Sequence, residues 1–246
     1  MKIGAGDRPN MRLCLVTQLC CLLILSLGSA PAAGGVSLES VSLRAGGSYS
    51  AVEGSFHDVV DGYVVGFTAA GGLGLRLGPV PIQAELWVIR KGGRMGSLTF
   101  SDSTFGGFTF PALRWLVSYV EVPVLAKLEF GGWRAARPYV ILGPGLAYRF
   151  GGSVEQEGDF YYTSPGVRGR LQGARIFEDL SLNPLSDLRR FDMDAIAGAG
   201  LTLGQGRNRV LLEARWLEGL LNVLPEGSEL KGRNRAITVT LGLERR

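Results

Sequence analysis

Charged residues recur at alternate positions of several extended segments, and these residues could carry chemistry. Glu85 and Glu121 fall on neighbouring predicted strands, and two facing carboxylates can in principle perform acid–base catalysis. Because basic residues share their face and an unpaired buried ion costs several kcal/mol, we expect ion pairing instead. The predicted ion-pair network comprises Arg44, Arg76, Glu85, Glu121, Lys127, Arg149, Asp192, Asp194, Glu213 and Arg215.

The only histidine, His57, lies between Ser55 and Asp58 in a polar segment. A serine–histidine–carboxylate triad is defined by geometry, and neighbours in sequence do not provide that geometry. We therefore expect a solvated loop histidine and no enzyme; a lipid hydrolase using the His57 region is the alternative. One histidine, with every cysteine near the N-terminus, also gives no metal site, and we expect no cofactor.

The elements that position these residues begin after an N-terminal targeting segment. An apolar run at 13–27 follows Lys2, Arg8 and Arg12 and precedes small residues up to Ala33. This pattern predicts a secretory signal peptide over 1–33. An uncleaved anchor is the alternative, but the run of about 15 residues is short for a span of about 20.

The remaining residues, 34–246, are expected to form one domain that contains no cysteine. Its 23 basic and 21 acidic residues give a net charge of +2, from the chain totals of 26 and 22 less three basic residues and one acid. This near-neutral balance argues against a nucleic-acid partner.

Residues 119–130 show the organising pattern of this domain. Val120, Val122 and Val124 lie on one face of the predicted strand, and Glu121 and Lys127 lie on the other. A soluble sheet buries its apolar face, whereas a membrane barrel turns that face to lipid and its charges to the lumen. We expect eight such strands, at 38–48, 62–77, 80–91, 114–130, 137–150, 191–203, 208–218 and 233–244.

Short and long connections alternate between these strands, as they do in outer-membrane barrels. The sequence therefore predicts an all-β fold, an eight-stranded antiparallel up-and-down transmembrane β-barrel. Side chains just fill an interior of that size, so we expect a closed, ion-paired lumen. A soluble lipocalin-like periplasmic barrel is the alternative, and it requires the opposite faces. Aromatic residues near strand ends could form interfacial girdles: Tyr63, Phe130, Trp133, Tyr139, Tyr148, Phe150 and Phe191.

The longest predicted connection, 151–190, is the candidate binding surface. Phe160, Tyr161 and Tyr162 could anchor a partner, because exposed aromatic residues favour interfaces. They could equally be the top of an extended strand, and 177–190 could form a short helix or an extra strand pair. The expected partners are outer-membrane lipids, the barrel-assembly machinery and an unidentified envelope protein contacting this loop.

Several strands together resemble the PorT-like outer-membrane β-barrel family. The matching elements are the strand end Glu85–Lys91–Gly92, the strand Tyr119-x-Glu121-x-Pro123, and Arg137-Pro-Tyr followed by Gly143-x-Gly145. The resemblance covers about residues 36–244. It implies an eight-stranded barrel in the outer membrane of a diderm bacterium, and we expect periplasmic termini and a structural or loop-mediated binding role.

Overall fold

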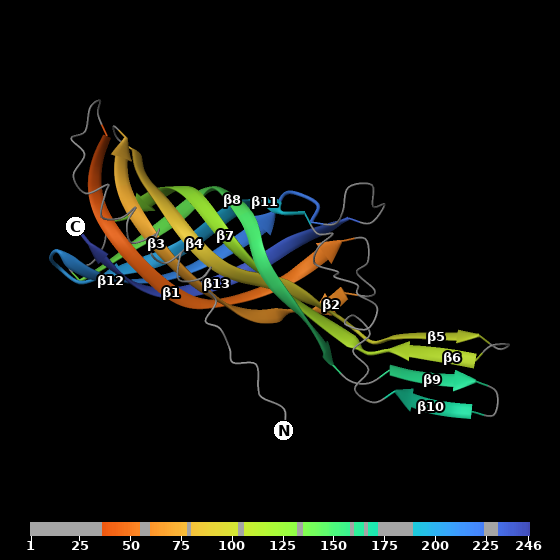
Figure 1. Ribbon diagram of the computed structural model, residues 1–246. Coiled ribbons are helices and arrows are strands. Elements are labelled where there is room, and N and C mark those ends of the chain that lie inside the picture. The colour runs from red at the N-terminus through yellow and green to blue at the C-terminus, as the bar shows by residue number, and fades with distance from the viewer. Residues whose placement is uncertain are drawn as a thin grey trace, which may run out of the picture.

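Eight long antiparallel strands close into a barrel in this computed structural model (Figure 1). The structure describes residues 36–54, 60–77, 80–102, 106–131, 135–157, 160–164, 167–171, 189–223 and 231–246. The predicted signal peptide and His57 lie outside them. In the described part, no helix has the length and hydropathy of a membrane span.

The barrel strands follow one another around the ring, and β4 pairs with β7 to close it. This arrangement confirms the predicted fold class, and every predicted strand corresponds to an observed one. The strands are β1 (Val36–Gly54), β3 (Val64–Leu77), β4 (Val80–Met95), β7 (Ala112–Glu129), β8 (Ala136–Glu157), β11 (Phe191–Leu203), β12 (Asn208–Gly219) and β13 (Gly232–Arg245).

The two faces of the barrel wall differ in polarity, as predicted. On β7, Val122 and Leu128 are 46% and 54% exposed, whereas the alternating Glu121 is fully buried. Successive residues of a strand point to opposite sides, so charged side chains fill the interior and apolar side chains cover the outside. This is the arrangement of a lipid-facing barrel, and it excludes the lipocalin-like alternative.

Four further strands form a second sheet beyond one end of the barrel (Figure 1). They are two hairpins, β5 (Leu98–Asp102) with β6 (Gly106–Phe110) and β9 (Phe160–Ser164) with β10 (Val167–Leu171), joined through β6 and β9. A short strand, β2 (Val60–Gly62), pairs with β4 at the same end. Residues 92–113 were left outside the predicted strands, although β5 and β6 lie there, because Gly, Ser and Thr between the phenylalanines weaken the strand pattern.

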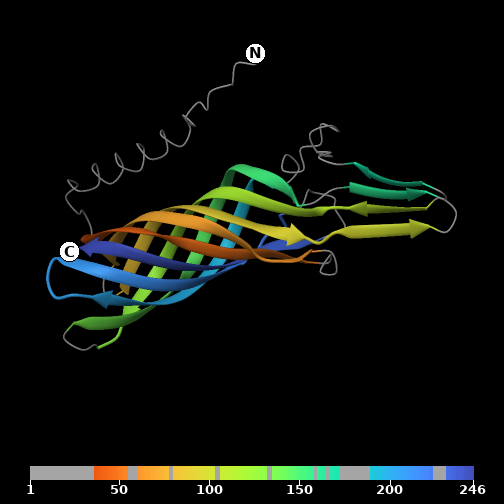
Figure 2. The ribbon, with the colours of Figure 1, turned by 90° about the horizontal axis from the view of Figure 1, so that it is seen from below.

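The short connections and the C-terminus lie at the other end of the barrel, away from the second sheet (Figure 2). The turn between β11 and β12 contains Gly204 and Gly206, with φ angles of +108° and +144°. Glycine adopts such angles without the strain that a side chain would cause, which explains the tight turn.

Tyr63, Tyr148 and Phe191 are exposed on the outer surface, Tyr63 and Phe191 at strand ends as predicted and Tyr148 within the longer observed β8. Tyr63 stacks on Tyr49 with ring centroids 4.5 Å apart, and Tyr148 meets Phe191 edge to face at 5.1 Å. The assignment of Tyr139 to a girdle was wrong. Its side chain is buried inside the barrel, because it shares a strand face with Ile141 and Ala147.

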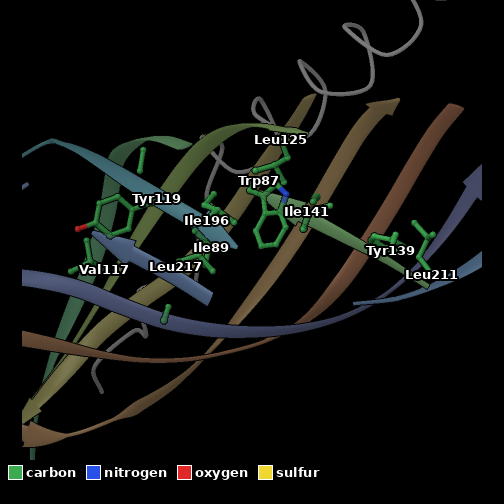
Figure 3. Close-up of a cluster of buried hydrophobic side chains, with 13 residues drawn as sticks. Trp87, Ile89, Val117, Tyr119, Leu125, Tyr139, Ile141, Ile196, Leu211 and Leu217 are labelled. Atoms are coloured by element: carbon green, nitrogen blue, oxygen red, sulfur yellow. The ribbon is translucent and has the colours of Figure 1, made fainter. Parts of the chain in front are cut away.

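The interior also holds large apolar side chains that contact one another (Figure 3). They include Trp87, Leu125, Ile141, Ile196 and Leu211, none of them more than 2% exposed. The face that the sequence assigns to the charged residues of the fourth predicted strand also carries Tyr119 and Leu125, whereas Trp87, Ile141, Ile196 and Leu211 were not assigned to the interior. Together the apolar and charged groups fill the lumen as a packed core.

Candidate functional site

Two arginines and two glutamates meet in the middle of the lumen, and we call them the Glu85 cluster. Glu85 accepts hydrogen bonds from Arg215 Nη1 and Nη2 at 2.6 and 2.9 Å, and it also binds Arg44. Arg215 Nε lies 2.5 Å from Glu213 Oε1. All four side chains are at most 1% exposed. The cluster is neutral, as its removal from water requires.

Two aromatic side chains complete the Glu85 cluster. The Arg215 guanidinium lies 4.3 Å from the ring centroid of Trp87, whose indole nitrogen donates to Glu85. The Tyr139 hydroxyl donates to Glu213 at 2.8 Å. The participants come from β1, β4, β8 and β12, so their hydrogen bonds connect strands that are not neighbours in the ring.

Glycines on adjacent strands give these large side chains their space. Arg44 lies opposite Gly242 in the strand register, and a Cβ added at Gly242 would come within 2.6 Å of the Arg44 side chain. Arg215 lies opposite Gly198 in the same way, and there the distance would be 3.0 Å. Pairing a large residue with a small one fits the narrow interior.

A second buried group, the Lys91 cluster, joins β4, β7 and β11. Lys91 Nζ lies 2.6 Å from Asp194 Oδ2 and 2.9 Å from Glu121 Oε2. Asp192 accepts a hydrogen bond of 2.8 Å from Asn234. One lysine thus faces three buried carboxylates. Asp194 Oδ1 and both Glu121 oxygens have no hydrogen-bond donor in the described part of the chain, although Lys91 forms an ion pair with Glu121.

The third charged group lies at the end of the barrel with the short connections, which we call the short-turn mouth. Lys127 lies 3.2 Å from Glu129 and 3.3 Å from Glu244, and its ammonium group is 4.4 Å from the Tyr139 ring centroid. Arg246 also binds both carboxylates. A cavity of about 330 Å³ opens here, lined by residues that include Gln83, Lys127 and Arg246.

The structure brings most of the predicted network into these three groups. Two residues do not pair with these groups. Arg76 also lies at the short-turn mouth, but its half-exposed side chain pairs with Glu39 at 2.5 Å. Arg149 is partly buried, and its backbone nitrogen donates to Arg190 at 2.7 Å, near the opposite end.

Sequence reasoning missed several participants: Trp87, Lys91, Tyr139, Asn234, Glu244 and Arg246. Lys91 lies six residues after Glu85 on β4 and therefore on the same strand face. Following the alternation of faces to the end of that strand would have identified Lys91 as an inward residue. Tyr139 was assigned to an interfacial girdle because it is aromatic, without regard to the strand face on which it lies. Glu244 lies near the end of the predicted last strand, where the preceding inward residues are threonines.

Of the predicted binding aromatics, Tyr161 is 45% exposed on β9. The structure thus supports the extended-strand reading of this segment, while the side chains of Phe160 and Tyr162 lie outside the description. Residues 172–188, which contain most of the predicted helix or strand pair, also lie outside it. Phe108 and Phe110 on β6 are exposed beside β9, and sequence reasoning had placed them in a loop.

No group of three His, Cys, Asp or Glu among the described residues is arranged to hold a metal ion. The chemistry that the interior geometry supports is electrostatic: charged side chains cross-link strands in a space from which water is excluded.

Comparison with known proteins gives one family match. The profile of the outer membrane protein beta-barrel domain matches residues 32–224. No curated protein matches the sequence. Among solved structures, the chain is similar to Neisserial surface protein A, with 10% identity, a TM-score of 0.41, and coverage of 84% of this chain and 98% of that one. It is also similar to Ail of Yersinia pestis, with 13% identity, a TM-score of 0.37, and coverage of 83% and 97%.

Proposed function

Since this chain belongs to the outer membrane protein beta-barrel domain family, we propose that it is a non-conducting outer-membrane barrel that binds a partner through its second sheet. Within the family, the motifs around Glu85, Glu121 and Arg137 favour the PorT-like group. We assign the barrel no catalytic role. Outer-membrane lipids and the assembly machinery are its general partners, and the specific partner is an envelope protein.

The packed lumen is the observation that carries this proposal. Trp87, Tyr119 and Tyr139 are at most 2% exposed, and the Glu85 cluster lies between β1, β4 and β12. A path for ions would require these groups to separate, which would leave buried charges unpaired. The functional surface is therefore outside the lumen.

The second sheet supplies that surface. Its described aromatic side chains Phe108, Phe110 and Tyr161 are between 37% and 46% exposed, although each lies in a hydrogen-bonded strand. Ordered, exposed aromatic residues offer large contact areas with little loss of side-chain entropy on binding.

The proposed orientation places the short turns and both termini in the periplasm and the second sheet outside the cell. Short periplasmic turns and longer outer loops are usual for such barrels. Single cysteines test this orientation, because the predicted mature chain has none. With a membrane-impermeant maleimide, we expect Thr99→Cys to be labelled in intact cells and Gln205→Cys only after permeabilisation. The reverse pattern would overturn the orientation.

Two measurements test the function. Purified protein in planar bilayers should show no stepwise conductance, and regular steps would contradict the closed lumen. A photo-crosslinker at Tyr161 should give one discrete adduct in intact cells, and Phe108→Ser with Phe110→Ser should abolish it. Thr99→Ser, on neighbouring β5, is the matched control and should leave the adduct unchanged. Persistence of the adduct in the phenylalanine variant would remove the second sheet as the binding surface.

A further inference from the structure

Four arginines converge at the short-turn mouth, on the opposite end of the barrel from the second sheet. Arg137 and Arg209 are the second residues of β8 and β12, Arg246 follows β13, and Arg207 lies in the turn before β12. Two backbone hydrogen bonds of 2.9 Å bring these segments together: Gly204 donates to Ala135, and Arg246 donates to Arg207.

The positive charge of this group is only partly compensated by the carboxylates beside it. Its carboxylates, Glu129 and Glu244, already bind Lys127 and Arg246. Arg137, Arg207 and Arg209 form no ion pair within the described residues, so five cationic side chains share two carboxylates. Like charges placed so close together repel one another unless an anion lies between them.

Arg209 shows the imbalance most directly. Its Nε donates to the Gly206 carbonyl at 3.1 Å, but its Nη1 is buried and has no acceptor in the described part of the chain. Burial and the charges of Arg246 and Arg137 disfavour its positive charge, while Glu244 and Glu129 act in the opposite direction. A buried donor without an acceptor is uncommon in folded proteins, and an anion bound at the mouth would supply one.

The alternation of side chains between the two faces of a strand directs three of these arginines into the mouth. Each of the three lies two residues from a buried residue and so on the same, inward side of the chain: Arg137 from Tyr139, Arg209 from Leu211 and Arg246 from Glu244. Arg245, in contrast, has the phase of Leu243, which is 64% exposed on the outer wall. Arg137 and Arg207 are exposed, and Arg246 lines the 330 Å³ cavity, so the group is open to water at the barrel end.

The geometry points to a binding site for a phosphate group, supplied by a soluble molecule, formed by Arg137, Arg207, Arg209 and Arg246 at the short-turn mouth. The guanidinium fork matches two phosphate oxygens at once, and several arginines around one anion would neutralise the surplus charge. The site is separate from the proposed partner surface and does not depend on it.

Calorimetry with inorganic phosphate on the folded barrel in detergent tests this inference. We expect saturable binding that weakens with added salt. Combining Arg137→Gln with Arg209→Gln should weaken it about tenfold or more, because two bidentate contacts are lost. The exposed-turn variant Arg207→Gln should weaken it less. Arg245→Gln removes one charge from the outer wall of the same end and should leave binding unchanged.

Heat-modifiable gel mobility will show whether each variant is folded, and Arg207→Gln provides the test if the double variant does not fold. Three results would overturn the site: no saturable phosphate binding, no loss in the folded variants, or an equal loss in Arg245→Gln. Flotation with phosphatidylglycerol vesicles tests whether the bound phosphate belongs to a lipid headgroup or to a soluble molecule. Arginine-dependent vesicle binding without phosphate binding would make the ligand a lipid and refute the proposal.

Discussion

The Glu85 cluster and the short-turn mouth use the same side-chain types in opposite ways. In the cluster, two arginines and two glutamates neutralise one another and are almost completely buried. At the mouth, arginines outnumber carboxylates and several are exposed. Burial forces charges to balance, because an uncompensated ion without water is costly, whereas solvent at the mouth tolerates a surplus. A charge imbalance can therefore serve binding only where water reaches it.

Removing the Glu85 carboxylate should cause the largest loss of stability, and it tests whether the charges of the interior must balance. Glu85→Ala leaves Arg44 and Arg215 buried with one carboxylate between them, and we expect a loss of about 3–5 kcal/mol in the free energy of unfolding. Urea unfolding in detergent measures it. A loss below about 1 kcal/mol, the usual value for a surface ion pair, would show that water enters the lumen.

Lys91→Met should come next, with a loss of about 3 kcal/mol, because Glu121 and Asp194 lose their shared cation. Adding Asp194→Asn should restore part of that stability, since it removes one of the two facing charges. If the double variant is less stable than Lys91→Met alone, repulsion between the carboxylates is not the cause.

The mouth pair of Arg76 with Glu39 should contribute much less. Both side chains are at least one-third exposed, so Glu39→Ala should cost at most about 1 kcal/mol. The same urea titration compares it directly with Glu85→Ala. If Glu39→Ala and Glu85→Ala lost the same free energy of unfolding, ion pairs in the interior and at the mouth would not differ in their contribution to stability.

Arg137→Gln should have the smallest effect on the free energy of unfolding, a change within about 0.5 kcal/mol in either direction, because it removes an exposed charge that forms no ion pair with the described residues. Stability should then be nearly unchanged while phosphate affinity falls. A large loss of stability would mean that Arg137 has a structural role instead.

Strand alternation carried most of the fold prediction. On β7 and β8 the inward and outward residues could be separated by parity alone, since each strand shows one face to each side of the wall. The second sheet was missed because its short strands contain Gly, Ser and Thr, and hydrogen bonding between two distant loops stabilises them. No local pattern records that β6 and β9 pair.

The site was less predictable than the fold. Residue type suggested that Glu85 and Arg215 would belong to one ion-paired network, but it named no partners. Lys91 as the shared partner of Glu121 and Asp194 depends on which strands face each other across the lumen. Tyr139 was misplaced because an aromatic residue near a strand end suits an interface or an interior equally well. Closure of the ring places its hydroxyl beside Glu213.

The sequence by itself determined which residues line the barrel and which face lipid, because a period of two is fixed by the strand backbone. It also determined that the interior must be charged and compensated. Only the tertiary structure decided which charges meet, because ring closure and strand register bring together residues more than a hundred positions apart, such as Glu85 and Arg215. The same closure gathers the arginines of the mouth, whose surplus charge no single strand reveals.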